Sequence, residues 1–206
     1  MANKEKLPEL YDIGALSESI EMKCVSCMKM AEKGKHDEAL KCLSEMETSF
    51  KSAHAQAALF KGLVLMDFGK FDEAKSMLQD AMKFNPSSAF PYLALAACEY
   101  KLGHKGNMLP LLKKAIELAP NDVNVLTMAS VAYYSIDRVK EGDECMKKAT
   151  ELSPHAAYAS LELGIKKLLE DPSMDSETKK RLKGVMNKNK KLVESITALR
   201  NLKRKK

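Results

Sequence analysis

Residues 69–86 read Gly-Lys-Phe-Asp-Glu-Ala-Lys-Ser-Met-Leu-Gln-Asp-Ala-Met-Lys-Phe-Asn-Pro, and the pattern of this stretch returns further along the chain. Four columns of residues recur at intervals of 34 positions: Gly69, Gly103 and Asp137; Ala81, Ala115 and Ala149; Phe84, Leu118 and Leu152; and Pro86, Pro120 and Pro154. Agreement among four columns in one register indicates a repeated structural unit.

Each repeat has the features of a helical hairpin. Ala74 and Leu78 are four residues apart and therefore share one face of a helix. Gly69 can end the preceding helix in the left-handed conformation, and Pro86 stops the following one. The register gives units at 55–88, 89–122 and 123–156, with a first hairpin over about 17–49. A fifth unit begins at 157–170.

A period of 34 residues is typical of the tetratricopeptide repeat, a helix–turn–helix unit that stacks on its neighbours. The chain therefore resembles tetratricopeptide proteins over most of its length. We expect an all-α fold, a right-handed superhelical stack of about four hairpins with a C-terminal capping helix. We expect an N-terminal extension at 1–16, a repeat array at 17–170 and a basic amphipathic capping helix and tail at 171–206.

Charge is distributed unevenly along the chain. Residues 176–206 contain 12 Lys or Arg and 2 acidic residues, so the basic character belongs to this segment. The segment has no aromatic residue, which disfavours base stacking and with it a nucleic-acid role. A solvated cap is the first interpretation, and contact with an acidic lipid surface or RNA is the second.

Composition restricts the class of protein further. With 206 residues, 45% hydrophobic and 30% charged, the chain has the composition of a folded protein. The N-terminus lacks the apolar segment of a secretory signal, and Lys61 interrupts the apolar stretch at 55–66, so we expect no membrane span. The 5 cysteines are odd in number and scattered, which predicts no disulfide framework and favours a reducing compartment.

No constellation of side chains indicates catalysis. Cys24 and Cys27 form the one close cysteine pair, but zinc needs four ligands and no second pair exists, so we interpret the pair as helix packing. The histidines fall at turns, and the chain has no Gly-rich phosphate loop. We therefore expect no enzyme activity, cofactor, metal or small-molecule substrate.

The first helices of tetratricopeptide hairpins line the concave face, which is the usual surface for binding a partner. The register places apolar and aromatic residues there, and they favour an amphipathic helix or an extended apolar peptide as ligand. For each residue, packing between hairpins is an equal alternative. The predicted groove residues are Leu59, Leu63, Met66, Phe90, Leu93, Ala97, Tyr100, Val131, Tyr134, Tyr158 and Leu161.

Some tetratricopeptide proteins bind the acidic tails of chaperones with Lys, Asn and Arg at fixed groove positions. In this chain those positions hold mainly apolar residues, which disfavours that mode of binding. They are Cys24, Met28, Phe60, Ala94 and Met128.

A narrower resemblance rests on short segments in a fixed order. Glu9-Leu-Tyr-Asp-Ile13, the segment Asp37 to Met46, Pro154-His155 with Tyr158, and Ser176-Glu-Thr-Lys-Lys180 resemble the second subunit of the ER membrane protein complex. The resemblance implies a soluble scaffold on the cytosolic side of a membrane-protein insertase. It would bind cytosolic segments of the membrane-embedded subunits and would associate with the membrane only through them. The alternative is a general tetratricopeptide adaptor or co-chaperone that binds a peptide tail.

Overall fold

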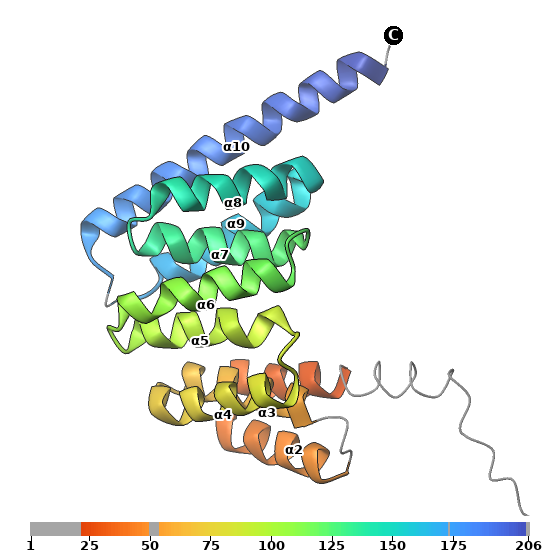
Figure 1. Ribbon diagram of the computed structural model, residues 1–206, viewed down its shortest axis with the longest axis vertical. Coiled ribbons are helices and arrows are strands. Elements are labelled where there is room, and N and C mark those ends of the chain that lie inside the picture. The colour runs from red at the N-terminus through yellow and green to blue at the C-terminus, as the bar shows by residue number, and fades with distance from the viewer. Residues whose placement is uncertain (1–21, 50–53, 173, 205–206) are drawn as a thin grey trace, which may run out of the picture. The chain divides into compact units, whose positions relative to one another are not determined.

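The computed structural model describes residues 22–49, 54–172 and 174–204, and these residues are helical apart from short turns (Figure 1). The expected extension at 1–16 and the start of the first hairpin lie outside this range. A helix over residues 22–32 comes first. It is followed by α2 (His36–Ser49), α3 (His54–Asp67), α4 (Phe71–Phe84), α5 (Ala89–Lys101), α6 (Lys105–Leu118), α7 (Val123–Ser135), α8 (Val139–Leu152), α9 (Pro154–Leu169) and α10 (Ser176–Arg204).

The predicted fold class is confirmed: the described chain is all-α and built of helical hairpins of the tetratricopeptide type followed by a C-terminal helix. The turns between paired helices recur in the 34-residue register. Gly69, Gly103 and Asp137 have φ values of 75°, 81° and 64°, so the same column ends each first helix in the left-handed conformation. In the described ranges, no helix is long and apolar enough to cross a membrane.

The described helices form two compact units, which divide between Ser87 and Ser88. In the first unit, α3 and α4 pack closely because Gly62 has no side chain: a Cβ there would lie 2.7 Å from Leu78 Cδ2. Helix 22–32, α2 and α3 share a separate buried cluster that includes Ala39, Leu43 and Val64.

The cysteines of the first unit differ from the sequence-based expectation. Cys27 forms a disulfide with Cys42, which links helix 22–32 to α2 with a Cα–Cα separation of 6.1 Å. Cys24 is buried, and its thiol donates to Met46 Sδ at 3.9 Å. One bridge is not a disulfide framework, but the interpretation of Cys27 as a packing residue is wrong. The reason is that residues 15 apart in sequence become neighbours only when the hairpin folds.

The second unit contains the hairpins α5–α6 and α7–α8, followed by α9 and α10. The carboxylate of Asp122 begins α7, because it accepts hydrogen bonds from the backbone N–H groups of Asn124 and Val125 at 2.8 and 3.0 Å. A buried cluster joins α5, α6 and α7 through residues such as Leu93, Leu112 and Ala129.

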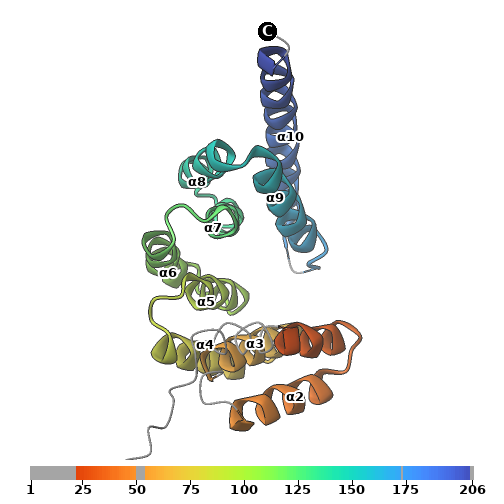
Figure 2. The ribbon, with the colours of Figure 1, turned by 90° about the vertical axis from the view of Figure 1, so that its right-hand side faces the viewer.

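Helix α10 packs along α9 and against α7 (Figure 2). Its Leu182 and Val185 join the buried cluster that contains Tyr134 and Leu161. Arg181 fixes the start of the helix, because Nε donates to the carbonyl oxygen of Tyr134 at 3.2 Å and Nη1 pairs with Asp137 at 2.9 Å. An ion pair between Lys101 and Asp171 ties the end of α5 to the segment before α10.

Candidate partner-binding surfaces

In the first unit, the predicted groove residues lie on one face of α3. Leu59, Leu63 and Met66 are spaced by four and three residues and are half-buried. The buried side of α3 consists of other residues, among them Ala57, Ala58 and Val64. The three residues therefore lie outside the fully buried side of α3.

In the second unit, the predicted groove residues of α5 differ in their exposure. Phe90 is 41% exposed, Ala97 is exposed and Tyr100 is half-buried. Phe90 and Ala97 are seven residues apart and so share a face of the helix. Leu93 is only 4% exposed and belongs to the cluster with Leu112, so it is a core residue and not a groove residue.

Three more predicted groove residues are buried, which corrects their assignment. Val131, Tyr134 and Leu161 are 9%, 0% and 0% exposed and pack with Leu182 and Val185 of α10. The physical reason is that neighbouring helices cover these residues. The ring of Tyr134 lies against Gly142 of α8, Val131 lies against Gly164 of α9, and α10 adds Leu182 and Val185 to the same cluster. Tyr158 on α9 is half-buried.

Tyr134 is held by polar contacts as well as by packing. Its hydroxyl donates to Asp143 Oδ1 of α8 at 2.8 Å. Burial raises the pKa of Tyr134 first, and the hydrogen bond to Asp143 raises the pKa further. A fully buried, hydrogen-bonded tyrosine anchors the core and cannot serve as a contact residue for a partner.

Met128, which the sequence analysis placed at one of the fixed groove positions but not among the predicted contact residues, is 44% exposed on α7. The 34-residue register indicates this position, because Met128 falls 34 residues after Ala94. Ala94 lies on the face of α5 that carries Phe90 and Ala97. Phe90, Ala97 and Met128 are the exposed apolar residues of this surface, which we call the inner face of the second unit.

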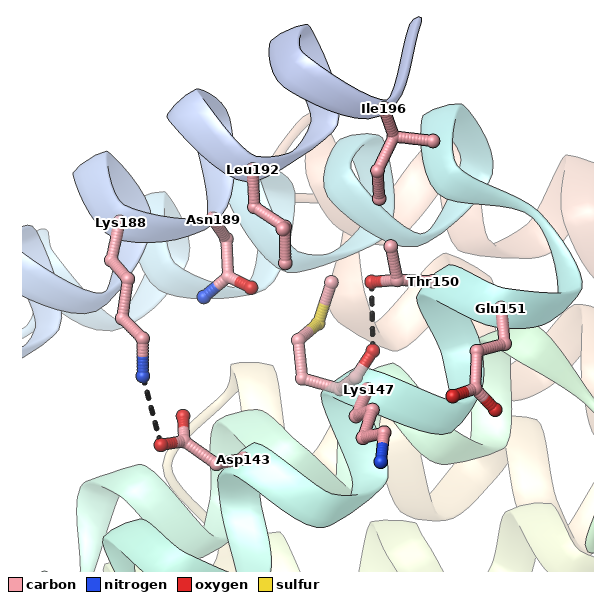
Figure 3. A pocket seen from close by; sticks show the side chains of 9 residues that line it. Asp143, Lys147, Thr150, Glu151, Lys188, Asn189, Leu192 and Ile196 are labelled. Carbon is pink, nitrogen blue, oxygen red and sulfur yellow. Dashed lines mark hydrogen bonds and ion pairs between the residues drawn. The ribbon is translucent and has the colours of Figure 1, made fainter. Parts of the chain in front are cut away.

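A cleft of about 580 Å³ lies between α8 and α10 (Figure 3). Figure 3 shows Leu192 and Ile196 pointing from α10 toward α8, where Thr150 faces them. Lys188 pairs with Asp143 at 2.9 Å at one end of the cleft. Lys147 and Glu151 of α8 also line it.

Polar residues elsewhere have structural partners. Glu99 is 3% exposed, and its carboxylate contacts Nδ1 of His104 and accepts from Asn107 Nδ2, both at 3.0 Å, which fixes the turn between α5 and α6. Over the part of the chain that the structure describes, no group of three or more His, Cys, Asp or Glu side chains could hold a metal ion.

Antiparallel helical hairpins with a 34-residue period define a helical-repeat protein. The chain contains tetratricopeptide repeats: the family model described as tetratricopeptide repeat matches residues 55–88 and 123–155. Tetratricopeptide repeats bind other proteins or peptides, and the fold is typically non-catalytic.

Solved structures agree with this fold. A crystal structure of MamA is 19% identical to the chain, with a TM-score of 0.53, and the match covers 82% of this chain and 95% of that one. A MamA structure from Desulfovibrio magneticus RS-1 is 19% identical, with a TM-score of 0.52 and coverage of 85% and 96%. A third MamA structure is 20% identical, with a TM-score of 0.51 and coverage of 86% and 96%. At this identity the likeness shows the fold alone.

Proposed function

We propose that the chain is a non-catalytic scaffold that binds an apolar helical or extended segment of a partner protein on its inner helices. The observation that carries this proposal is the exposure of Phe90 and Met128, at 41% and 44%, on first helices of neighbouring hairpins. Large apolar side chains that remain exposed on neighbouring first helices are suited to anchoring a partner.

The specific role that we propose is that of a subunit of the ER membrane protein complex, on the cytosolic face of the endoplasmic reticulum. This part of the proposal rests on the sequence resemblance. The surface that carries Phe90, Ala97 and Met128 is apolar and suits a helical partner segment. The first of the resembling segments, residues 9–13, lies outside the described residues.

The alternative role is that of a general tetratricopeptide adaptor or co-chaperone that binds a peptide tail. In this role the same inner face would bind the tail of another protein in place of a segment of a membrane-embedded subunit. Ala94 and Met128 leave the inner face of the second unit without basic groups at the positions that clamp acidic tails. A tail bound here would therefore be held by apolar contacts.

Affinity purification of the tagged protein from its own cells in a mild detergent separates the two roles. A stoichiometric set of multi-spanning membrane proteins that survives high salt supports the insertase role, since apolar contacts resist salt. Recovery of chaperones alone leaves the adaptor role. Counting the free thiols of the purified protein tests its cellular compartment. Cytosolic proteins rarely retain a disulfide such as Cys27–Cys42, so an intact bridge would argue against a cytosolic location.

Paired variants test the inner face itself. Phe90→Glu with Met128→Glu should abolish recovery of the partner, because two charges would be buried at the interface. Both side chains are substantially exposed, so folding should persist and is checked by circular dichroism. The control Val139→Glu places a charge on a 37% exposed residue of the second helix α8 and should leave recovery unchanged. Equal recovery with all three proteins would contradict the proposal.

A further inference from the structure

One face of α10 is buried against the second unit, and this packing fixes which residues the helix exposes. Leu182, Val185, Asn189 and Val193 are spaced by three and four residues and are at most 8% exposed. Asn189 is also bonded within the helix, since its Nδ2 donates to the carbonyl oxygen of Val185 at 2.9 Å. Figure 1 shows α10 along one edge of the second unit, so its opposite face is directed away from that unit.

The exposed face of α10 carries four lysines, which we call the lysine stripe. Lys180, Lys183, Lys190 and Lys191 are all exposed. Residues three, seven and eleven positions apart share a face of a helix, so these lysines lie on the side away from the buried Leu182. At 1.5 Å of rise per residue, the stripe extends over about 17 Å.

The lysine stripe is not neutralised within its own helix. Over the residues that the structure describes, none of its four side chains takes part in an ion pair or a hydrogen bond, in contrast to Lys188, which pairs with Asp143. The two glutamates of α10, Glu177 and Glu194, lie beyond the two ends of the stripe. The exposed face is therefore positive along the whole length between them.

The residue types of this face restrict the class of ligand. Over residues 180–191 the exposed side is made of lysines with Gly184 and Asn187, so it offers no apolar or aromatic anchor for a stable protein interface. Arg181, the one arginine of this stretch, is half-buried and bonded to the end of α7 and the turn after it. Without a free guanidinium or an aromatic ring, the face is poorly suited to RNA. Exposed lysines suit a surface of diffuse negative charge, such as an anionic bilayer.

The charge of the remaining chain would orient such a contact. The whole chain has a net charge of +6, and residues 176–206 contribute +10, so residues 1–175 carry −4. A negatively charged surface would attract α10 and, on average, repel the rest of the chain. This asymmetry favours an approach by the edge that α10 forms.

We propose that the lysine stripe docks on the anionic surface of a lipid bilayer, with α10 lying along the plane of the headgroups. The contact is electrostatic and reversible, because the stripe has no apolar side chain to insert among the acyl chains. Of the two sequence-based interpretations of the basic segment, this inference adopts the contact with acidic lipid. The contact is direct and adds to the partner contacts of the inner face.

Co-sedimentation of the full chain with lipid vesicles tests the proposal. Vesicles of phosphatidylcholine with about one-third phosphatidylserine should bind the protein, raised salt should release it, and phosphatidylcholine alone should not bind it. Lys183→Glu with Lys190→Glu should weaken binding by about 30-fold or more, because each lysine near such a surface contributes roughly fivefold. The control Lys113→Glu with Lys148→Glu makes the same change in net charge at exposed positions of α6 and α8 and should alter affinity less than about threefold. Circular dichroism should show the helicity of the parent protein in both variants, because all four lysines are exposed.

Several outcomes would overturn the proposal. Equal affinities of the two double variants would show that binding follows net charge and not the stripe. Loss of binding only when the basic residues 203–206 are removed would assign the lipid contact to the C-terminal tail. Binding of a uridine oligonucleotide or of polyglutamate that the stripe variant abolishes, without vesicle binding, would assign the stripe to RNA or to an acidic protein. The stripe variant retains Phe90 and Met128, so recovery of the partner in detergent tests the proposed function separately.

Discussion

Gly142 of α8 lies directly against the aromatic ring of Tyr134 on α7, so that a Cβ at this position would be 2.5 Å from Tyr134 Cε1. Two repeats earlier, in the repeat at 55–88, the same register position holds Ala74, and the chain has glycine instead at Gly142. The ring fills the space of the missing methyl group, and its hydroxyl reaches Asp143 at 2.8 Å. The glycine is therefore the consequence of a bulky first-helix residue and not a weak point in the helix.

Gly142→Ala should destabilise the protein by about 1–3 kcal/mol, because the added methyl group overpacks a ring that is fixed by a hydrogen bond. Gly184→Ala in α10 is the matched control, since a Cβ there meets nothing within 4 Å. It should stabilise the protein by about 0.5–1 kcal/mol through helix propensity. Urea unfolding of both variants measures the difference, and a stabilising Gly142→Ala would contradict the packing.

Gly103 and Gly106 should respond to alanine with opposite signs. Gly103 has a φ of 81°, so alanine is strained there and should cost about 1–2 kcal/mol. Gly106 lies inside α6 with open space around it, so alanine should stabilise by about 0.5–1 kcal/mol. Thermal unfolding gives the melting temperatures of the two single variants, which test this expectation. Equal melting temperatures would argue against the left-handed turn.

Alkaline pH should destabilise the protein partly through Tyr134. Its pKa is raised in the folded state by burial and by Asp143, whereas an unfolded tyrosine titrates near pH 10. The folded state thus binds the phenolic proton of Tyr134 more tightly than the unfolded state does. The resulting stabilisation of the fold is complete below about pH 10 and is lost as pH rises above that value. Tyr134→Phe should cost about 1 kcal/mol at neutral pH by losing the hydrogen bond.

The pH dependence separates this role of Tyr134 from simple packing. Above pH 10, the unfolding free energy should fall less steeply with pH in Tyr134→Phe than in the parent protein. The two slopes should differ by about 1.4 kcal/mol per pH unit. Absorbance of tyrosinate at high pH reports the titration directly. Identical slopes would show that Tyr134 ionises freely in the folded protein.

Thiol counting tests the disulfide. Without reductant, the unfolded chain should show three reactive thiols, because Cys27 and Cys42 are bonded and Cys24, Cys98 and Cys145 are not in disulfides. In the folded protein these three should react slowly, since all are buried and burial raises the pKa of Cys145 to about 11. Five thiols in the unfolded chain would show that the pair is reduced.

Loss of the disulfide should also lower stability. Cys27→Ser with Cys42→Ser removes a crosslink across a separation of 15 residues, which should cost about 3 kcal/mol. A reducing agent should destabilise the parent protein and leave the double variant unaffected. Melting curves with and without reductant give the comparison.

Part of the candidate site could be predicted from the sequence, because the spacing along a helix decides which residues share a face. Leu59, Leu63 and Met66 lie on one face of α3, and Phe90 and Ala97 lie on one face of α5, because i, i+4 and i+7 spacing fixes which residues share a face. The burial of Val131, Tyr134 and Leu161 was not predictable from the repeat. It depends on how α8 and α9 pack against α7, and on α10, which begins 15 residues after Leu161 and belongs to no repeat.

The sequence by itself determined the hairpins, their 34-residue period and the left-handed turns, because helix faces, glycine turns and proline stops are encoded within a few residues of one another. The tertiary structure decided which inner residues remain exposed, the pairing of Cys27 with Cys42 and the cleft between α8 and α10. These features depend on how segments separated in sequence come together. That outcome rests on the complementarity of whole helix faces, as at Gly142 and Tyr134, which no local pattern records.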